Sequence, residues 1–214
     1  HVSGEEVASN ARRVGKLVGD KALSSAVHIT KNTARFYQRP ATKSDNNGFD
    51  TLEGLFAGAD RINELFLAKM KAYSDAFGGE FHGAPVKSED RALQKVFRSY
   101  KEDFFKLCDL NRCALVFKTL KSISETLEAL TKDPEINIVK MKSTKMRFSE
   151  HYNAHLSAGY RDVQISICIN TEWTCRMGLD RMILEVQLHD KALYDKKMHG
   201  GHEGYTQRRN QLGQ

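Results

Sequence analysis

Two acidic residues lie beside or within apolar stretches of the sequence, where a buried carboxylate could hold a metal ion. Asp109 in "LCDLNRCALVF" comes just before an apolar stretch, and Glu185 lies inside another, "MILEVQLHD" (182–190). A carboxylate at such a place can coordinate a divalent cation, whereas an unpaired one inside a strand is costly. Each acid has a structural alternative, because Asp109 could cap a turn and Glu185 could belong to an ion pair. The pair predicts a metal site only in combination with groups that bind phosphate.

A run of basic residues precedes these acids in "VKSEDRALQKVFRSY" (86–100). If the whole stretch were helical, Lys87, Arg91, Lys95 and Arg98 would lie at i, i+4, i+8 and i+11 and form one ridge. Like charges at this spacing repel one another unless an anion or neighbouring acids neutralise them. The ridge therefore predicts a phosphate-binding surface, and the alternative is a solvated helix face.

A second basic stretch, "KMKSTKMRF" (140–148), ends in Arg147 and Phe148. Its lysines are also typical of an exposed edge strand protected from aggregation. Arg147 differs from them, because a guanidinium can grip a phosphate with two parallel hydrogen bonds. Farther on, Tyr160 offers a flat ring at a strand start, which could stack on a base or simply pack in the fold.

Two apolar stretches alternate with polar residues, "GYRDVQISICIN" (159–170) and 182–190. In the second stretch, one side carries Glu185, Gln187 and His189, and the other carries Val186 and Leu188. Successive side chains of a strand point to opposite faces. Two neighbouring strands with polar faces predict the floor of a site for a charged ligand.

Composition indicates a soluble globular chain that favours anionic partners. The 214 residues are 40% hydrophobic and 28% charged, with a formal net charge of +6, and no apolar run is long enough to span a membrane. Because the chain begins without Met, it could be part of a larger or secreted protein, so its compartment stays open. The sequence also does not indicate the oligomeric state. The four cysteines have no CxxC spacing, which favours a reducing environment over disulfides or zinc: Cys108, Cys113, Cys168 and Cys175. His199 and His202 are separated by two glycines, which argues against a helical zinc site.

The periodicity of the sequence predicts an α+β domain with a mixed sheet of about five strands flanked by helices. An N-terminal helical region (1–80) should precede a domain over 81–214. Helices are expected over 5–27, from an N-cap at Asp50 to about Phe77, over 119–132 and from about Lys191, with a loop over 38–50. Strands are expected over 112–118, 136–142, 159–170 and 182–190.

The order of these motifs resembles the synthetase domain of RelA/SpoT-type alarmone synthetases, over about residues 82–210. That family has a nucleotidyltransferase-like fold. Lys87, Arg91 and Lys95 keep the spacing of its ATP-binding stretch, with an arginine in the place of a serine. Asp109 matches the magnesium-binding aspartate that precedes the first core strand.

The second half of the resemblance lies in two further motifs. Arg147 and Phe148 precede the Gly159–Tyr160 pair at the family's distance, and this tyrosine stacks on the acceptor's guanine in the family. The strand pattern E-[IV]-Q-[IL]-R is matched from Glu185 onward. The chain departs from the family at several positions: Ser149 and Leu156 where a second phosphate-binding lysine is expected, Arg161 and Gln164 after the Gly-Tyr pair, and His189 in place of an arginine. The metal-dependent hydrolase domain of the bifunctional members is not recognisable.

The resemblance implies a magnesium-dependent pyrophosphokinase that transfers pyrophosphate from ATP to a ribose hydroxyl of GDP, GTP, ADP, ATP or an RNA end such as that of tRNA. Asp109 and Glu185 would hold Mg²⁺, with Glu185 and Arg147 also catalytic. The nucleotide-binding residues would be Lys87, Arg91, Lys95, Arg147, Tyr160, Gln187 and His189. Two alternatives stay open. One is an inactive nucleotide- or RNA-binding module, and the other is a toxin or effector domain that modifies RNA.

Overall fold

A computed structural model describes residues 49–149, 152–157 and 159–198. The helix expected over 5–27 and nearly all of the loop expected over 38–50 lie outside these residues. The boundary expected at residue 80 between a helical region and a second domain therefore stays a prediction. None of the helices in the described part is long and apolar enough to cross a membrane.

The described chain forms one five-stranded sheet with the order β1-β2-β5-β4-β3. Strands β2 and β5 are parallel and the other neighbours are antiparallel, which confirms the mixed sheet predicted from the sequence. The strands are β1 (Glu80–Gly83), β2 (Arg112–Phe117), β3 (Ile136–Met146), β4 (Val163–Ile169) and β5 (Leu184–Asp190). The sequence did not predict β1, because four residues are too few to show a clear alternation.

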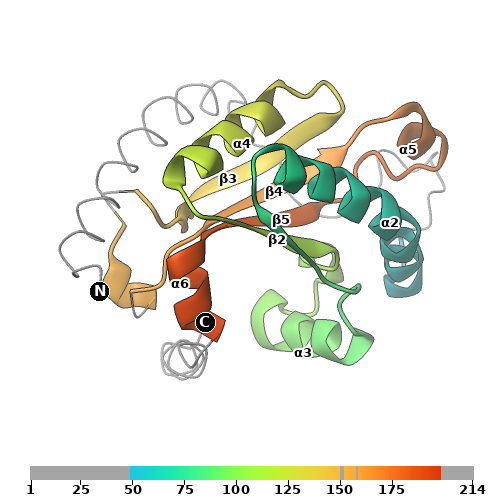
Figure 1. The fold of residues 1–214 in the computed structure, drawn as a ribbon. Coiled ribbons are helices and arrows are strands. Elements are labelled where there is room, and N and C mark those ends of the chain that lie inside the picture. The colour runs from blue at the N-terminus through green and yellow to red at the C-terminus, as the bar shows by residue number, and fades with distance from the viewer. Residues whose placement is uncertain (1–48, 150–151, 158, 199–214) are drawn as a thin grey trace.

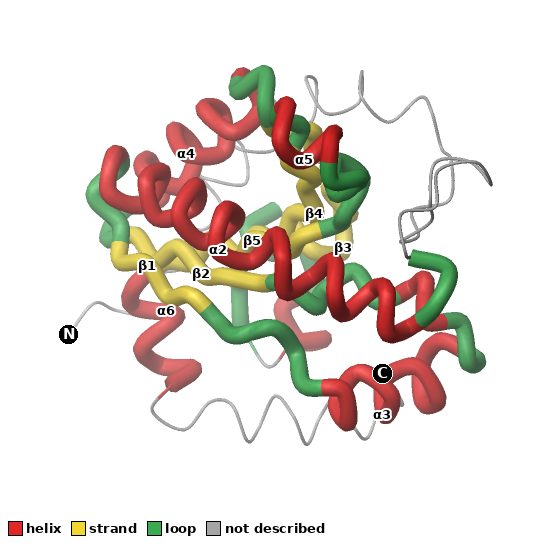
Figure 2. The backbone as a smooth tube through the Cα atoms, turned by 90° about the vertical axis from the view of Figure 1, so that its right-hand side faces the viewer, coloured by secondary structure: helices red, strands yellow, loops and turns green. Residues whose placement is uncertain are grey.

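The helices lie on both faces of this sheet (Figure 1). They are α2 (Leu52–Ala76), α3 (Glu89–Tyr100), α4 (Leu120–Lys132), α5 (Glu172–Arg176) and α6 (Lys191–Lys196). Helices α2 and α4 cover one face, whereas α6 and α3 lie on the opposite side, as the turned view in Figure 2 also shows. The sheet is thus a central layer between two unequal sets of helices.

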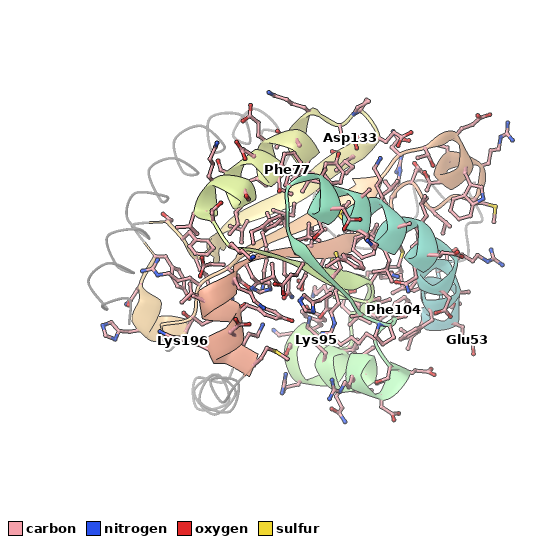
Figure 3. All side chains as sticks on the ribbon, in the orientation of Figure 1. Glu53, Phe77, Lys95, Phe104, Asp133 and Lys196 are labelled. Atoms are coloured by element: carbon pink, nitrogen blue, oxygen red, sulfur yellow. The ribbon has the colours of Figure 1, made fainter. Side chains whose placement is uncertain are left out.

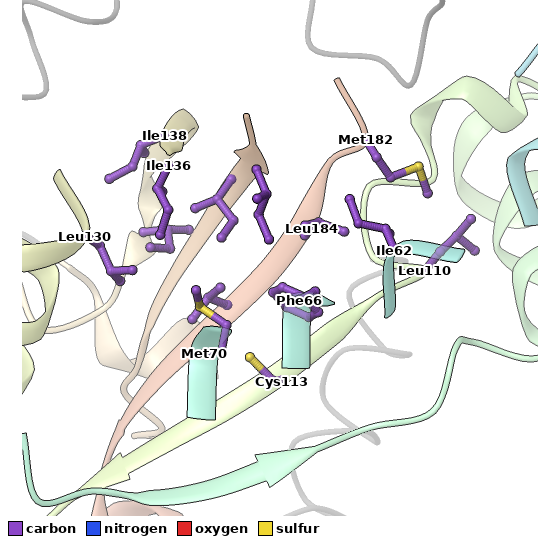
Figure 4. Packing of buried hydrophobic residues seen from close by; sticks show 14 of the residues in the cluster. Ile62, Phe66, Met70, Leu110, Cys113, Leu130, Ile136, Ile138, Met182 and Leu184 are labelled. Carbon is purple, nitrogen blue, oxygen red and sulfur yellow. The ribbon is translucent and has the colours of Figure 1, made fainter. Parts of the chain in front are cut away.

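The hydrophobic core fills the space between the sheet and α2 with α4. Ile62, Phe66 and Met70 follow one another at helical spacing on α2 and are fully buried against the strands (Figure 4). From the sheet side, β5 contributes Val186 and Leu188, both with no exposed surface. Because these residues alternate with the polar ones on β5, burying one face leaves the polar face turned toward α3 and α6.

The long helix α2 begins one residue later than predicted. Thr51, not Asp50, is its N-cap, since Thr51 has an extended backbone and its hydroxyl accepts a hydrogen bond from the Gly54 N–H at 3.0 Å. Asp50 stands in an exposed turn just before the cap. Such a cap satisfies one of the free N–H groups of the first helical turn.

Two other sequence expectations are corrected. The strand expected from 159 begins at Val163, because Gly159 has a left-handed backbone (φ 82°) and the Tyr160 N–H turns back to Ser157 O. The ridge of four cations does not exist as one helix face. Helix α3 begins only at Glu89, so Lys87 lies before the Ser88 N-cap, where its N–H donates to Leu110 O at 2.9 Å.

Candidate active site

The polar side of the sheet gathers residues from three strands. Glu185 pairs in register with Arg112 of β2 and with Ser166 of β4, and Gln187 pairs with Gln164. Residues paired across neighbouring strands share a face. We call this surface the polar face. It is the side of the sheet on which α3 and α6 lie (Figure 1).

Strand direction decides which predicted residues meet. Because β2 and β5 are parallel, the segment before β2, with Asp109, enters the sheet at the same end as Glu185. Strand β4 is antiparallel to β5, so the residues before β4, including Tyr160, approach the far end of β5 at His189. Glu185 and His189 are four residues apart on one strand, which corresponds to about 13 Å along the face.

At the first end, two lysines share one carboxylate oxygen. The Nζ atoms of Lys87 and Lys95 each lie 2.7 Å from Asp109 Oδ2. Lys87 comes from the loop before α3 and Lys95 from the side of α3 that faces the sheet (Figure 3). The other oxygen, Asp109 Oδ1, is buried and has no hydrogen-bond partner among the described residues. We call these three residues the lysine–aspartate cluster.

The cluster carries more positive than negative charge. Burial alone would raise the pKa of Asp109, but the charges of Lys95 and Lys87 outweigh it and hold that pKa at about 2. Burial lowers the pKa of Lys87 despite Asp109, and the charges of Lys95 and Arg112 add to that effect. Two ammonium groups and a nearby guanidinium therefore face a single carboxylate. An anion with several charges would relieve this imbalance.

At the other end, Asp162 ties Arg147 to Tyr160. Asp162 is fully buried and forms an ion pair with Arg147, which follows β3. Its second oxygen accepts hydrogen bonds from the Tyr160 hydroxyl (3.1 Å) and from Gln164 Nε2 (2.9 Å). Arg161 adds a hydrogen bond from its guanidinium to Arg147 O at 2.6 Å. These contacts hold the end of β3 against the start of β4.

A line of hydrogen bonds then connects Tyr160 with Glu185 along the polar face. The Tyr160 hydroxyl lies 2.9 Å from His189 Nδ1, and His189 Nε2 lies 3.3 Å from Gln187 Oε1. Gln187 Nε2 donates to Glu185 Oε1 at 2.7 Å. Because the Gln187 amide nitrogen is turned to Glu185, its oxygen faces His189 and accepts from the Nε2–H tautomer. The single proton of the Tyr160 hydroxyl then goes either to His189 Nδ1 or to Asp162 Oδ2. The ring that could receive a base is thus connected to the buried acid.

The imidazole in this line is neutral. Burial, followed by the charges of Lys197, His82 and Arg147, lowers the pKa of His189 to about 3. His189 has almost no exposed surface, and its ring contacts those of Tyr160 and Tyr194. Where the resembled family has an arginine, this chain therefore places an uncharged group that can accept one hydrogen bond and donate another.

This buried imidazole predicts a measurable sensitivity to acid. An unfolded histidine takes up a proton below its ordinary pKa of 6.5, whereas folded His189 stays neutral down to about 3. The unfolded state then binds more protons in this window, so the free energy of unfolding should fall as the pH falls from 6.5 toward 3. Between about pH 7 and pH 5, His189 should account for a loss of about 2 kcal/mol that His189→Gln no longer shows.

Urea unfolding of the wild type and of His189→Gln at both pH values measures this difference. His82→Gln is the matched control, because His82 is exposed and lies at the rim of the same face. Equal losses in the wild type and in His189→Gln would contradict the neutral, buried imidazole.

The structure places the predicted site residues, apart from Arg91, in two groups, the second of which is joined through Asp162, a residue that was not predicted. One group is the lysine–aspartate cluster, and the other is the line from Arg147 through Asp162, Tyr160, His189 and Gln187 to Glu185. Arg91 belongs to neither, because it is exposed on α3 one turn before Lys95, on the same side of the helix. Its predicted contact with ATP stays a prediction.

Two residues of the polar face were missed in the sequence. Asp162 carried a usable signal, because it is an acid directly before an apolar strand, as Asp109 nearly is. Lys197 had no recognisable signal in the sequence, although its ammonium lies 4.7 Å from the centre of the Tyr160 ring in the structure. It is the C-cap residue of α6, directly after Lys196, and only the path of the folded chain brings it back over the sheet.

Comparison with known proteins establishes the fold. No protein-family model and no curated protein sequence matches the chain. Among solved structures, it matches small alarmone synthetase 2 from Bacillus subtilis with a TM-score of 0.56 and 19% identity, over 77% of this chain and 86% of that one. It matches small alarmone synthetase 1 from the same organism, bound to its product pppGpp, with a TM-score of 0.54 and 16% identity, over 72% and 80%.

A GTP pyrophosphokinase family protein from Streptococcus pneumoniae gives a TM-score of 0.55 at 16% identity, over 74% of this chain and 80% of that one. The chain also spans 60% of the Type VI effector Tas1, where a TM-score of 0.42 at 21% identity is too low to establish a common fold. The described structure thus belongs to the class of mixed α+β, nucleotidyltransferase-like folds. Within that class, it has the RelA/SpoT-like fold of the small alarmone synthetases, as the resemblance predicted.

Proposed function

We propose that this protein transfers pyrophosphate from ATP to a ribose hydroxyl of a nucleotide, with Mg²⁺ as cofactor. The observation that carries the proposal is the polar face itself. A cationic cluster around Asp109 and a buried acid at Glu185 lie at one end, and a ring connected to Glu185 lies at the other. The structures that share this fold include a pyrophosphokinase family protein and an alarmone synthetase with its bound product.

The donor would bind at the lysine–aspartate cluster. Lys87 and Lys95 would turn from Asp109 to the phosphates of ATP and neutralise part of their charge. Arg91, which is exposed one turn before Lys95 on α3, would contact the same ligand from the solvent side. Arg147 supplies a guanidinium at the other end of the face.

The residues present fit a magnesium ion. Asp109 Oδ1 is a buried carboxylate oxygen without a partner among the described residues, while the two lysines occupy only Oδ2. Mg²⁺ is commonly held by one or two carboxylates together with substrate phosphates. Asp109 and Glu185 would hold it, and the ion would neutralise charge that builds up on the phosphates during transfer.

Glu185 would act as the base toward the acceptor. It takes the proton of the ribose hydroxyl as that oxygen forms a bond to the β-phosphorus of ATP. The bond between this phosphorus and the oxygen bridging to the α-phosphate breaks, and AMP leaves. Gln187 donates to Glu185 Oε1 and so fixes the direction in which the carboxylate points. Positioning and charge neutralisation are the main requirements of such a transfer.

A nucleotide-binding module without turnover is the second candidate. The observation that favours it is the occupation of Asp109 Oδ2 by two ammonium groups, which compete with a metal ion for the same carboxylate. Such a protein would bind ATP through the cluster but leave it intact.

Acceptor-dependent formation of AMP separates the two candidates. The full chain is incubated with Mg²⁺ and ATP, either alone or with GDP, GTP, ADP or tRNA, and the nucleotides are resolved by ion-exchange chromatography. We expect AMP to form in a one-to-one ratio with the acceptor that is consumed. Release of ADP and inorganic phosphate would indicate hydrolysis and contradict the proposal. Binding of ATP without any AMP would favour the binding module.

A further inference from the structure

Lys197 has no carboxylate to pair with in the described part of the chain. It directly follows α6, and its ammonium makes one hydrogen bond there, to the Tyr160 hydroxyl at 3.2 Å. The same ammonium lies 4.7 Å from the centre of the Tyr160 ring. A phenol is a weak partner for a full positive charge, and a cation over an aromatic ring contributes only modestly.

The nearby acids are already engaged by other groups. Asp162 accepts from Arg147, Tyr160 and Gln164, and Glu185 accepts from Gln187. Both acids still attract Lys197 at longer range, but Arg147 and Arg112 repel it. Burial is the largest effect and lowers the pKa of Lys197. The face therefore holds a cation whose charge its surroundings do not balance.

We infer that Lys197 is an anion-binding residue of the acceptor site, and that it pairs with a phosphate of a free nucleoside 5′-diphosphate or triphosphate. The base of that nucleotide would take the place of the Lys197 ammonium on the Tyr160 ring. This inference rests on the proposed function only in so far as Tyr160 receives the acceptor base. A hydrogen-bonded ammonium–phosphate pair is stronger than the contact with the ring, which drives the exchange.

The Lys197 ammonium can move from the Tyr160 ring to a phosphate without a large change in the backbone. Lysine is a flexible four-carbon chain, so its ammonium can move several ångströms while the end of α6 stays in place. Without a ligand, Lys197 covers the ring. With a nucleotide, the same side chain would hold the phosphate and leave the ring to the base. A nucleoside that lacks phosphate would have to displace the ammonium and would receive no ion pair in return.

The experiment compares nucleotides with nucleosides by isothermal titration calorimetry, in the absence of ATP. GDP, ADP, guanosine and adenosine are titrated into the full chain and into Lys197→Met, which keeps most of the chain length but not the charge. Lys196→Met is the matched control, because Lys196 is the exposed residue next to Lys197 and the last residue of α6. We expect Lys197→Met to weaken GDP or ADP binding about tenfold to a hundredfold, with nucleosides bound at least as tightly as by the wild type. Lys197→Arg should retain the preference for phosphate.

Three results would overturn the inference. Equal weakening of nucleotides and nucleosides would mean that Lys197 only supports the fold of the site. An unchanged preference for nucleotides would mean that another group binds the phosphate. A wild-type protein that binds neither nucleotides nor nucleosides would mean that there is no acceptor site of this kind for Lys197 to serve. Because these titrations contain no donor, they are separate from the measurement of transfer, and either can fail while the other succeeds.

Discussion

Asparagine in place of Asp109 is expected to lower kcat for pyrophosphate transfer by about 10² to 10³-fold. The substitution keeps the size of the side chain and removes the charge that would hold the metal ion. It also leaves Lys87 and Lys95, now 2.7 Å from a neutral group, without their common counter-ion. A smaller loss of stability, about 1–3 kcal/mol, should accompany the loss of turnover. Steady-state kinetics with saturating ATP and urea unfolding measure the two effects separately.

Asp103→Asn is the matched control for this variant. Asp103 pairs with Lys106 at 3.2 Å and caps a short helical turn, but it belongs to neither group of the candidate site. Its replacement should leave kcat unchanged. An Asp109→Asn protein that turns over at the wild-type rate would contradict the role of Asp109 in holding the metal.

Glutamine in place of Glu185 should lower kcat by about 10² to 10⁴-fold while leaving the fold nearly as stable. An amide cannot take the proton of the acceptor hydroxyl. Its oxygen can still accept the hydrogen bond from Gln187 Nε2, so the line to His189 and Tyr160 is preserved. The free energy of unfolding should therefore change by less than about 1 kcal/mol. The effect should fall on kcat rather than on the Kd for nucleotides.

Glu172→Gln provides the comparison, because Glu172 is an exposed acid on α5 whose partner, Arg176, is equally exposed. If Glu185→Gln instead destabilised the protein strongly and retained its turnover per folded molecule, Glu185 would be a structural acid. The alternative of an ion pair, left open by the sequence, would then be the better one.

Local pattern in the sequence was sufficient for most elements and for the two faces of β5. The alternation around Glu185 separates the polar residues from Val186 and Leu188, and that separation is what the folded sheet shows. Local pattern could not predict that β2 pairs with β5, because these strands are about seventy residues apart in the sequence. Without that pairing, the sequence could not show that Asp109 and Glu185 enter the sheet at the same end.

The candidate site was predictable where a residue type is chemically unusual in its place. Asp109 and Glu185 were found in this way, and Asp162 could have been. The helical spacing that joined Lys87 to Lys95 was wrong, yet both side chains meet at Asp109, because the loop and the helix approach it from two directions. Lys197 depended wholly on the path of the chain after α6, and no local pattern encodes that path.

The most direct test of the account is transfer of label from ATP labelled in its terminal phosphate, in the presence of Mg²⁺ and one acceptor at a time. GDP, GTP, ADP, ATP and tRNA are supplied in separate reactions. Each labelled product is isolated, and its mass is determined by mass spectrometry. We predict that one class of acceptor gains the label together with two phosphates, and that Glu185→Gln lowers the rate at which this product forms by about 10² to 10⁴-fold. A label found only in inorganic phosphate, or in a product with one added phosphate, would contradict pyrophosphate transfer.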